Sequence, residues 1–147
     1  MNTIRNTREQ LKAAIVAANL FPEDAIIIER KADLFERVRK SLSLAKNKMC
    51  LVIGVGSGTN LTPEAKTLYF ECEFTLGLWC HTIYDGNDTE EEKWEELIKL
   101  IHHMGTEHCE RKWQVLSFED IEIEAQPGST KGLLVRSTKL RKRVAVV

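Results

Sequence analysis

Apolar residues recur at every second position from Leu68 to Cys80, and this alternation is the clearest pattern in the chain. A side-chain period of two is that of a β-strand with one face on the core and one face outside. The sequence therefore predicts a long antiparallel strand over Leu68–His81. The continuous apolar run Met49–Val55, which precedes it, is typical of a second strand that is buried on both faces.

Three other segments repeat their apolar residues every three or four positions, the spacing of an amphipathic helix. The first is expected to begin at a capping box, Thr7–Gln10, and to end before Pro22. A shorter helix should follow Asp33, and a third should run from Thr89 to a stop at Gly105. The expected buried stripes are Leu11, Ala14, Ile15 and Ala18; Leu34, Val38 and Leu42; and Trp94, Leu97, Ile98 and Ile101.

The remaining apolar segments have strand character. Ala25–Ile28 is β-branched and predicts a brief strand or an extended connector. Trp113–Ile123 alternates imperfectly, and Gln126–Ser129 has the proline and glycine of a turn. Leu133–Val147 predicts one long strand or two broken ones. Its alternating lysine and arginine positions are typical of an edge strand protected by charge.

The order of these segments predicts an α+β fold, in which a mostly antiparallel sheet of two hairpins packs against two to three helices. The chain has 147 residues, of which 43% are hydrophobic and 29% charged, as in an ordinary soluble domain. No linker or repeat interrupts it, so residues 1–147 are expected to form one domain. No stretch has the length of a membrane span or of a signal peptide, so we expect a protein that stays inside the cell, away from membranes.

Charge is unevenly distributed although the net charge is only −1. From Ala125 to Val147 there are six basic residues and no acidic one. From Glu71 to Glu96 there are nine acidic residues and the single Lys93. Two segments of opposite sign suggest a molecule that docks against copies of itself. The alternative is two separate solvated faces.

The glycine-rich run Gly54–Thr59 follows a buried strand, as phosphate-binding loops do. Its spacing is G-x-G-x-G, which matches neither a dinucleotide fingerprint nor a Walker loop. The next segment contains Pro63 and leads into the strand at Leu68, whereas both phosphate-binding motifs open a helix. Ser57 stands between glycines, but it lacks the strand-to-helix turn of a nucleophile elbow. We expect a mobile loop between two strands; a nucleotide- or small-ligand-binding enzyme domain is the alternative.

Histidine and cysteine also gather near the end of the third predicted helix, where the side chains concerned are His102, His103, His108 and Cys109. Their spacing matches no closed set of zinc ligands, and an exposed helix end explains the histidines. Four cysteines without CxxC spacing are expected to be free thiols, mostly buried. The sequence thus predicts no catalytic residue, no metal and no cofactor. A metal-binding enzyme domain that uses the His102–Cys109 cluster stays open as an alternative.

Taken together, the order of elements resembles the small tail-terminator and neck proteins of long-tailed bacteriophages and prophages, and related minor tail proteins. The resemblance is carried by the first helix (Thr7–Leu20), the long hairpin (Cys50–Val55 with Leu68–His81), the acidic helix (Thr89–Met104) and a basic closing hairpin. It implies a structural virion component and not an enzyme. The expected form is a homo-oligomeric, hexameric ring that caps the tail tube.

The same resemblance implies partners: tail-tube proteins, head–tail connector proteins, and DNA passing without sequence preference through the lumen. The protein would be located in the virion, and in the host cytoplasm during assembly. An adaptor module of a tail-like secretion machine is a further alternative. The residues expected at the subunit or partner interface are Gly56, Ser57 and Gly58 in the loop, Tyr69 and Trp79 on the outward side of the long strand, and the basic residues Arg141, Lys142 and Arg143.

Overall fold

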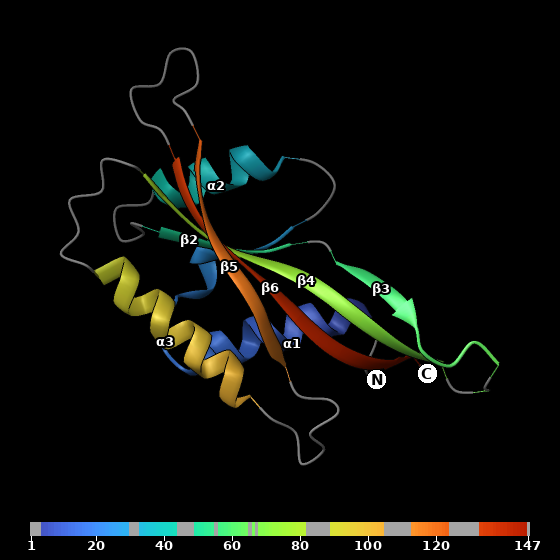
Figure 1. The fold of residues 1–147 in the computed structure, drawn as a ribbon. Coiled ribbons are helices and arrows are strands. Elements are labelled where there is room, and N and C mark those ends of the chain that lie inside the picture. Colours follow the sequence, from blue (N-terminus) through green and yellow to red (C-terminus); the bar gives the residue numbers. More distant parts are fainter. Residues whose placement is uncertain are drawn as a thin grey trace.

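The computed structural model describes residues 4–29, 33–43, 49–54, 56–64, 66, 68–81, 89–104, 113–123 and 133–146. Within these ranges the chain forms three α-helices and six β-strands (Figure 1). The helices are α1 (Ile4–Ala17), α2 (Leu34–Ser43) and α3 (Thr89–His103). The strands are β1 (Ile26–Ile28), β2 (Met49–Ile53), β3 (Ser57–Asn60), β4 (Leu68–His81), β5 (Gln114–Ile123) and β6 (Leu133–Val146). No helix in the described ranges is both long and apolar enough to span a membrane.

The six strands form one sheet in the order β1-β2-β4-β6-β5, with β3 beside β4, so the predicted α+β class is confirmed. Only β1 and β2 run parallel; every other pair is antiparallel. The two predicted hairpins join along β4 and β6, which pair from Leu68 opposite Val146 to His81 opposite Leu133.

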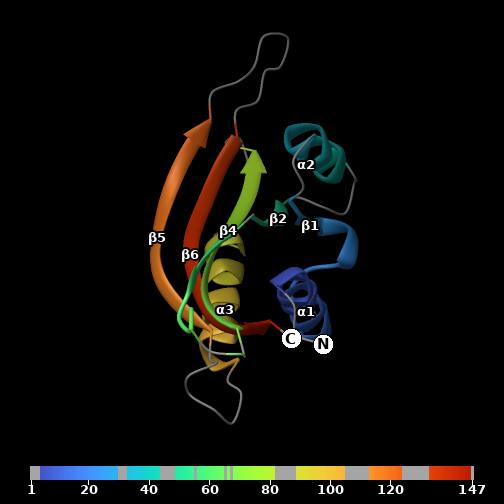
Figure 2. The ribbon, with the colours of Figure 1, turned by 90° about the vertical axis from the view of Figure 1, so that its right-hand side faces the viewer.

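The prediction that the C-terminal strand is an edge strand is wrong. β6 lies inside the sheet, with β4 on one side and β5 on the other. The alternation of residue types reports which face is buried, but it carries no information on whether a strand has neighbours at both sides. Figure 2 shows instead that β5 is the outermost strand of the curved sheet.

Helices cover both faces of the sheet. The even-numbered residues of β4 and β6 face α1 and α3, and we call this side the α1/α3 face; the odd-numbered residues define the α2 face. The larger core, on the α1/α3 face, contains Leu11, Ile15, Leu51, Phe74, Leu76, Leu78, Trp94, Leu97, Ile101 and Leu140. The smaller core lies under α2 and contains Ile27, Val38, Leu42, Cys50, Val52, Trp79 and Val135. The α2 face, expected to lie outside, is therefore buried at the end where α2 packs.

The predicted helices are all present, but the first one starts earlier than its capping box suggests. α1 begins at Ile4, so Thr7 lies within the helix, where it is 2% exposed. The predicted cap at Thr7 is therefore wrong, because the short S/T-x-x-E/Q pattern also occurs inside helices. The stop before Pro22 is right: α1 ends at Ala17, and Asn19 follows with a positive φ of 58°.

The glycine-rich run is the other departure from expectation. Ser57–Asn60 is a strand, paired with Phe70–Glu73 of β4, so the expectation of a mobile loop is wrong there. β2 and β3 lie one after the other along the same side of β4, and the Gly54 N–H donates to the Thr75 carbonyl at 2.7 Å between them. The run still connects strands and opens no helix, as predicted.

Candidate interaction surfaces

Acidic residues of β4 face basic residues of β6 across the part of the α2 face that α2 leaves open. Glu71 lies opposite Arg143 and Glu73 lies opposite Arg141. Arg141 Nη2 is 3.2 Å from Glu73 Oε1, and Arg141 Nε is 3.8 Å from Glu71 Oε1. Arg143 Nε is 4.0 Å from Glu71 Oε1. Glu71 and Glu73 of β4 thus pair with Arg141 and Arg143 of β6 within one chain.

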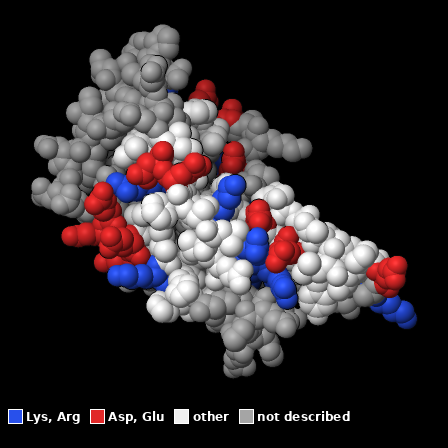
Figure 3. Space-filling view, in the orientation of Figure 1, with Lys and Arg blue, Asp and Glu red and all other residues white. Residues whose placement is uncertain are grey.

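This pairing changes the interpretation of the charged segments. Two acidic and two basic residues of these stretches form one ion-pair ladder within the chain, so these four charges do not stand on separate faces. Figure 3 shows acidic and basic side chains side by side across one side of the molecule, with a mainly acidic area over α3. Arg141 and Arg143, expected at an interface, already have partners in the monomer.

Lys142 points to the opposite side of β6, the α1/α3 face. Its Nζ lies 5.0 Å from the centre of the Trp113 ring, within the range of a cation–π contact. Burial lowers the pKa of the Lys142 ammonium, because desolvation disfavours the charged form. Trp113 in turn packs against Phe74, with 5.8 Å between ring centres. Lys142 therefore belongs to the rim of the main core rather than to an exposed basic patch.

The two aromatic residues predicted on the outward side of β4 have different surroundings. Trp79 is 8% exposed, because α2 covers it and the Phe35 ring meets it edge-on at 5.6 Å. Trp79 is thus not available at the surface, contrary to expectation. Tyr69 is half-buried near the other end of β4, where its N–H donates to Thr62 Oγ1 at 3.1 Å. The alternating pattern could not reveal that a helix covers only one half of this face.

The remaining predicted interface residues, Gly56, Ser57 and Gly58, are all exposed. They lie on β3 or directly before it, along a side of the strand to which no described residue pairs. We call this unpaired side of β3 the β3 edge. Figure 1 shows β3 as a short strand beside β4, on the side away from β6.

Exposed apolar side chains gather at the sheet margins. Among the described residues, the large hydrophobic side chains with substantial exposure are Phe35, Leu61, Leu68, Leu116, Phe118 and Ile121. Three of them lie on β5, whose outer side has no partner strand in the described part of the chain; we call it the β5 edge. Phe118 is 73% exposed, the most of the six. In the sequence these residues fall within the imperfectly alternating segment Trp113–Ile123, a pattern that does not separate exposed from buried apolar side chains.

Leu61 and Leu68 lie at the opposite margin, beside β3. Leu61 directly follows β3, and its N–H donates to the Tyr69 carbonyl at 2.8 Å. Leu68 is the first residue of β4. Apart from Phe35 on α2, the exposed apolar groups thus occupy two different edges of one sheet.

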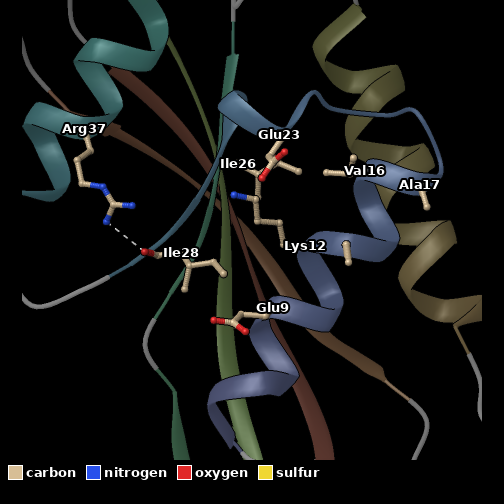
Figure 4. Close-up of a pocket in the computed structure, with 9 residues that line it drawn as sticks. Glu9, Lys12, Val16, Ala17, Glu23, Ile26, Ile28 and Arg37 are labelled. Carbon is tan, nitrogen blue, oxygen red and sulfur yellow. Dashed lines mark hydrogen bonds between the residues drawn. The ribbon is translucent and has the colours of Figure 1, made fainter.

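A groove of about 560 Å³ lies along β1, between α1 and α2 (Figure 4). Its floor is apolar, and its rim carries Glu9, Lys12, Glu23 and Arg37. Arg37 Nη1 donates to the Ile28 carbonyl at 3.1 Å. The charged side chains of the lining are Glu9, Lys12, Glu23 and Arg37, and it contains no serine, threonine, cysteine or histidine.

The other candidate chemistry is not brought together in the described residues. His102 and His103 are exposed at the end of α3, with 5.3 Å between ring centres, while His108 and Cys109 lie outside the described ranges. Nowhere in those ranges do three or more histidine, cysteine or acidic side chains gather as metal ligands would. Cys50, Cys72 and Cys80 are free and buried, as expected.

A comparison of the chain with models of known protein families gives no match, and a comparison with curated protein sequences gives none either.

Proposed function

We propose that this protein is a structural component that assembles head to tail into a ring, of the tail-terminator or neck type found in phage tails. The observation that carries the proposal is the placement of exposed apolar side chains on two different edges of one sheet, at Phe118 and its neighbours on β5 and at Leu61 and Leu68 beside β3. A contact between unlike surfaces is heterologous; repeated around an axis it gives a ring when the rotation closes and an open filament when it does not.

The β5 edge supports the proposed assembly, because an exposed apolar edge strand in a monomer tends to pair with other chains and aggregate. Natural proteins shorten, charge or cover such strands. β5 has ten residues, and beyond the irregularity between Val115 and Ser117 it bears the exposed Phe118 and Ile121 together with the acidic residues Glu119, Asp120 and Glu122. Asp120 lies 3.6 Å from Arg136 of the same chain, which offsets its charge. Burial against another copy would remove the apolar groups from water.

In this role the protein would cap the tail tube as a hexamer, contacting tail-tube and head–tail connector proteins, with DNA passing through the lumen without sequence preference. It would be made in the host cytoplasm and retained in the virion. Glu71 and Glu73 pair with Arg141 and Arg143, and this pairing is consistent with a ring wall that carries no strong charge of one sign at these residues. The role needs no catalytic residue.

Mass determination of the purified protein tests the proposal. Native mass spectrometry and light scattering should give one closed assembly, six copies in the tail-terminator case, and electron microscopy should show rings. Phe118→Asp should give folded monomers, because a carboxylate would have to be buried in the contact. A strict monomer at high micromolar concentration would refute the assembly. Capsid, portal and tail-tube genes beside this one would favour a virion over a secretion machine.

A further inference from the structure

We propose that successive copies join by strand addition: the β5 edge of one copy pairs antiparallel with the β3 edge of the next, so that the sheet continues across the contact. This inference rests on the proposed ring, and it specifies which two surfaces form the contact between neighbouring copies. The occupant of each edge is a second copy of this chain.

The first argument is that the apolar groups of the β5 edge lie on both faces of the sheet. Phe118 is opposite Thr138 and shares the α1/α3 face, whereas Ile121 is opposite Val135 and shares the α2 face. A partner lying flat on one face would cover only one of these side chains. A partner strand added at the edge carries side chains on both of its faces and covers both.

The margin beside β3 has the same arrangement. Leu61 continues the β3 ladder through its bond to Tyr69, so it lies on the α2 face. Leu68 is an even-numbered residue of β4 and lies on the α1/α3 face. Both edges therefore offer main-chain groups flanked by apolar side chains on each side of the sheet.

The β3 edge is a better acceptor than β1, the other unpaired strand side in the described residues. β1 has three residues and lies between α1 and α2 (Figure 2). The Ile28 carbonyl already accepts from Arg37, and the Glu29 carbonyl accepts from Arg8 Nη1 at 2.9 Å. β3 is also short, with four residues, but all four are exposed and none is charged or a proline.

Strand direction also fits. β3 and β6 both run antiparallel to β4, and β5 runs antiparallel to β6, so β5 and β3 run in opposite directions. When a second copy extends the sheet without being turned over, its β5 lies antiparallel to β3. The two α1/α3 faces then lie on the same side, which places Phe118 of one copy on the same side as Leu68 of the next.

Cysteine pairs test the contact in the full-length protein carrying C109S, so that the introduced thiols are the reactive ones. Thr59, Ser117 and Glu119 all lie on the α2 face. T59C combined with S117C, or with E119C, should form intermolecular disulfides under mild oxidation and give a ladder of oligomers on a denaturing gel. The matched control T59C with F118C places the thiols on opposite faces and should give at least tenfold less product.

The outcomes separate this inference from the proposed function. If the mass measurements give a ring but neither same-face pair cross-links, strand addition at β3 is wrong while the ring stands. Cross-linking of I28C with F118C instead would assign the contact to β1 and overturn the inference. If the parent protein is a monomer, both proposals fail together.

Discussion

Glu73 on β4 and Arg141 on β6 lie opposite each other in the sheet, and Arg141 Nη2 donates a 3.2 Å hydrogen bond to Glu73 Oε1. The same guanidinium also approaches Glu71. The side chains of Arg141 and Glu73 are 35% and 45% exposed, so water screens the pair. Arg141→Ala should therefore lower the free energy of unfolding by only about 1 kcal/mol, measured by urea denaturation.

Salt and a neighbouring variant provide the controls. In 1 M NaCl the loss should shrink, because the Debye length falls to about 3 Å. Lys139→Ala, on the same face and exposed, should cost less than about 0.5 kcal/mol at either salt concentration. Equal losses for the two variants would contradict a specific role of the Arg141 ion pairs. Neither variant should change the mass of the proposed assembly, since both residues lie away from the two edges.

Gly56 and Gly58 provide a matched pair of glycine substitutions. A Cβ on Gly56 would overlap the Glu73 carbonyl and lie 2.6 Å from Phe74 Cδ1, whereas a Cβ on Gly58 would have nothing nearer than Cys72 Sγ at 3.4 Å. Gly56→Ala should thus destabilise the fold by about 1–3 kcal/mol, because the backbone must shift. Gly58→Ala should be nearly neutral. Thermal unfolding of both variants checks the prediction, which fails if the two midpoints agree.

Trp79 should matter for stability rather than for assembly. Trp79→Ala removes a buried ring between β4 and α2 and should cost about 3–5 kcal/mol. Phe35→Ala, which loses only the exposed partner of the edge-on contact, should cost clearly less. Chemical denaturation compares the two, and Trp79→Phe should recover part of the loss. A fully stable Trp79→Ala protein that no longer assembles would reverse the assignment.

Cys50 links stability to alkaline pH. Burial raises the pKa of its thiol to about 11, against the opposing effects of the Ser41 hydrogen bond and of Arg37. The pKa of this thiol is higher in the folded protein than in the unfolded one. Its contribution to the free energy of unfolding is therefore fully present below about pH 9 and is lost as pH rises towards 11. The free energy of unfolding should therefore be about 2 kcal/mol lower at pH 11 than at neutral pH from this group alone.

The comparison with Cys50→Ala isolates this effect from other alkaline titrations. The variant should lose less stability than the parent between pH 9 and 11, although it is less stable at pH 7. At neutral pH, Cys50 should also react with thiol reagents only after unfolding, because the buried group remains a thiol. Identical pH profiles for the two proteins would show that Cys50 ionisation does not contribute.

Local pattern was enough to predict most elements. The period of two over Leu68–His81 gave β4 with its observed bounds, and the helical stripe at Trp94, Leu97 and Ile101 gave α3. What local pattern could not supply was the order of strands. The burial of Trp79 depends on α2, and the partners of Arg141 come from β4, about 70 residues earlier in the chain. Such contacts depend on topology, which no short window of sequence contains.

The same limit applies to the candidate surfaces. Gly56, Ser57 and Gly58 are predicted at a subunit or partner interface; they are exposed, and their contact with a partner stays a prediction. Phe118 and Ile121 were missed, because an apolar residue in an alternating segment is normally assigned to a core. Whether it is exposed depends on whether another strand or helix reaches it, and α3 does not cover Phe118.

The interior position of β6 has a consequence for biosynthesis. β6 is the last strand in the chain, yet in the sheet it lies between β4 and β5. While the ribosome is still making residues 133–146, β5 has no strand to pair with and one side of β4 is open. The nascent chain therefore cannot complete its sheet before those residues emerge. A messenger truncated before this strand would yield a product with exposed strands, which chaperones would bind and proteases would degrade.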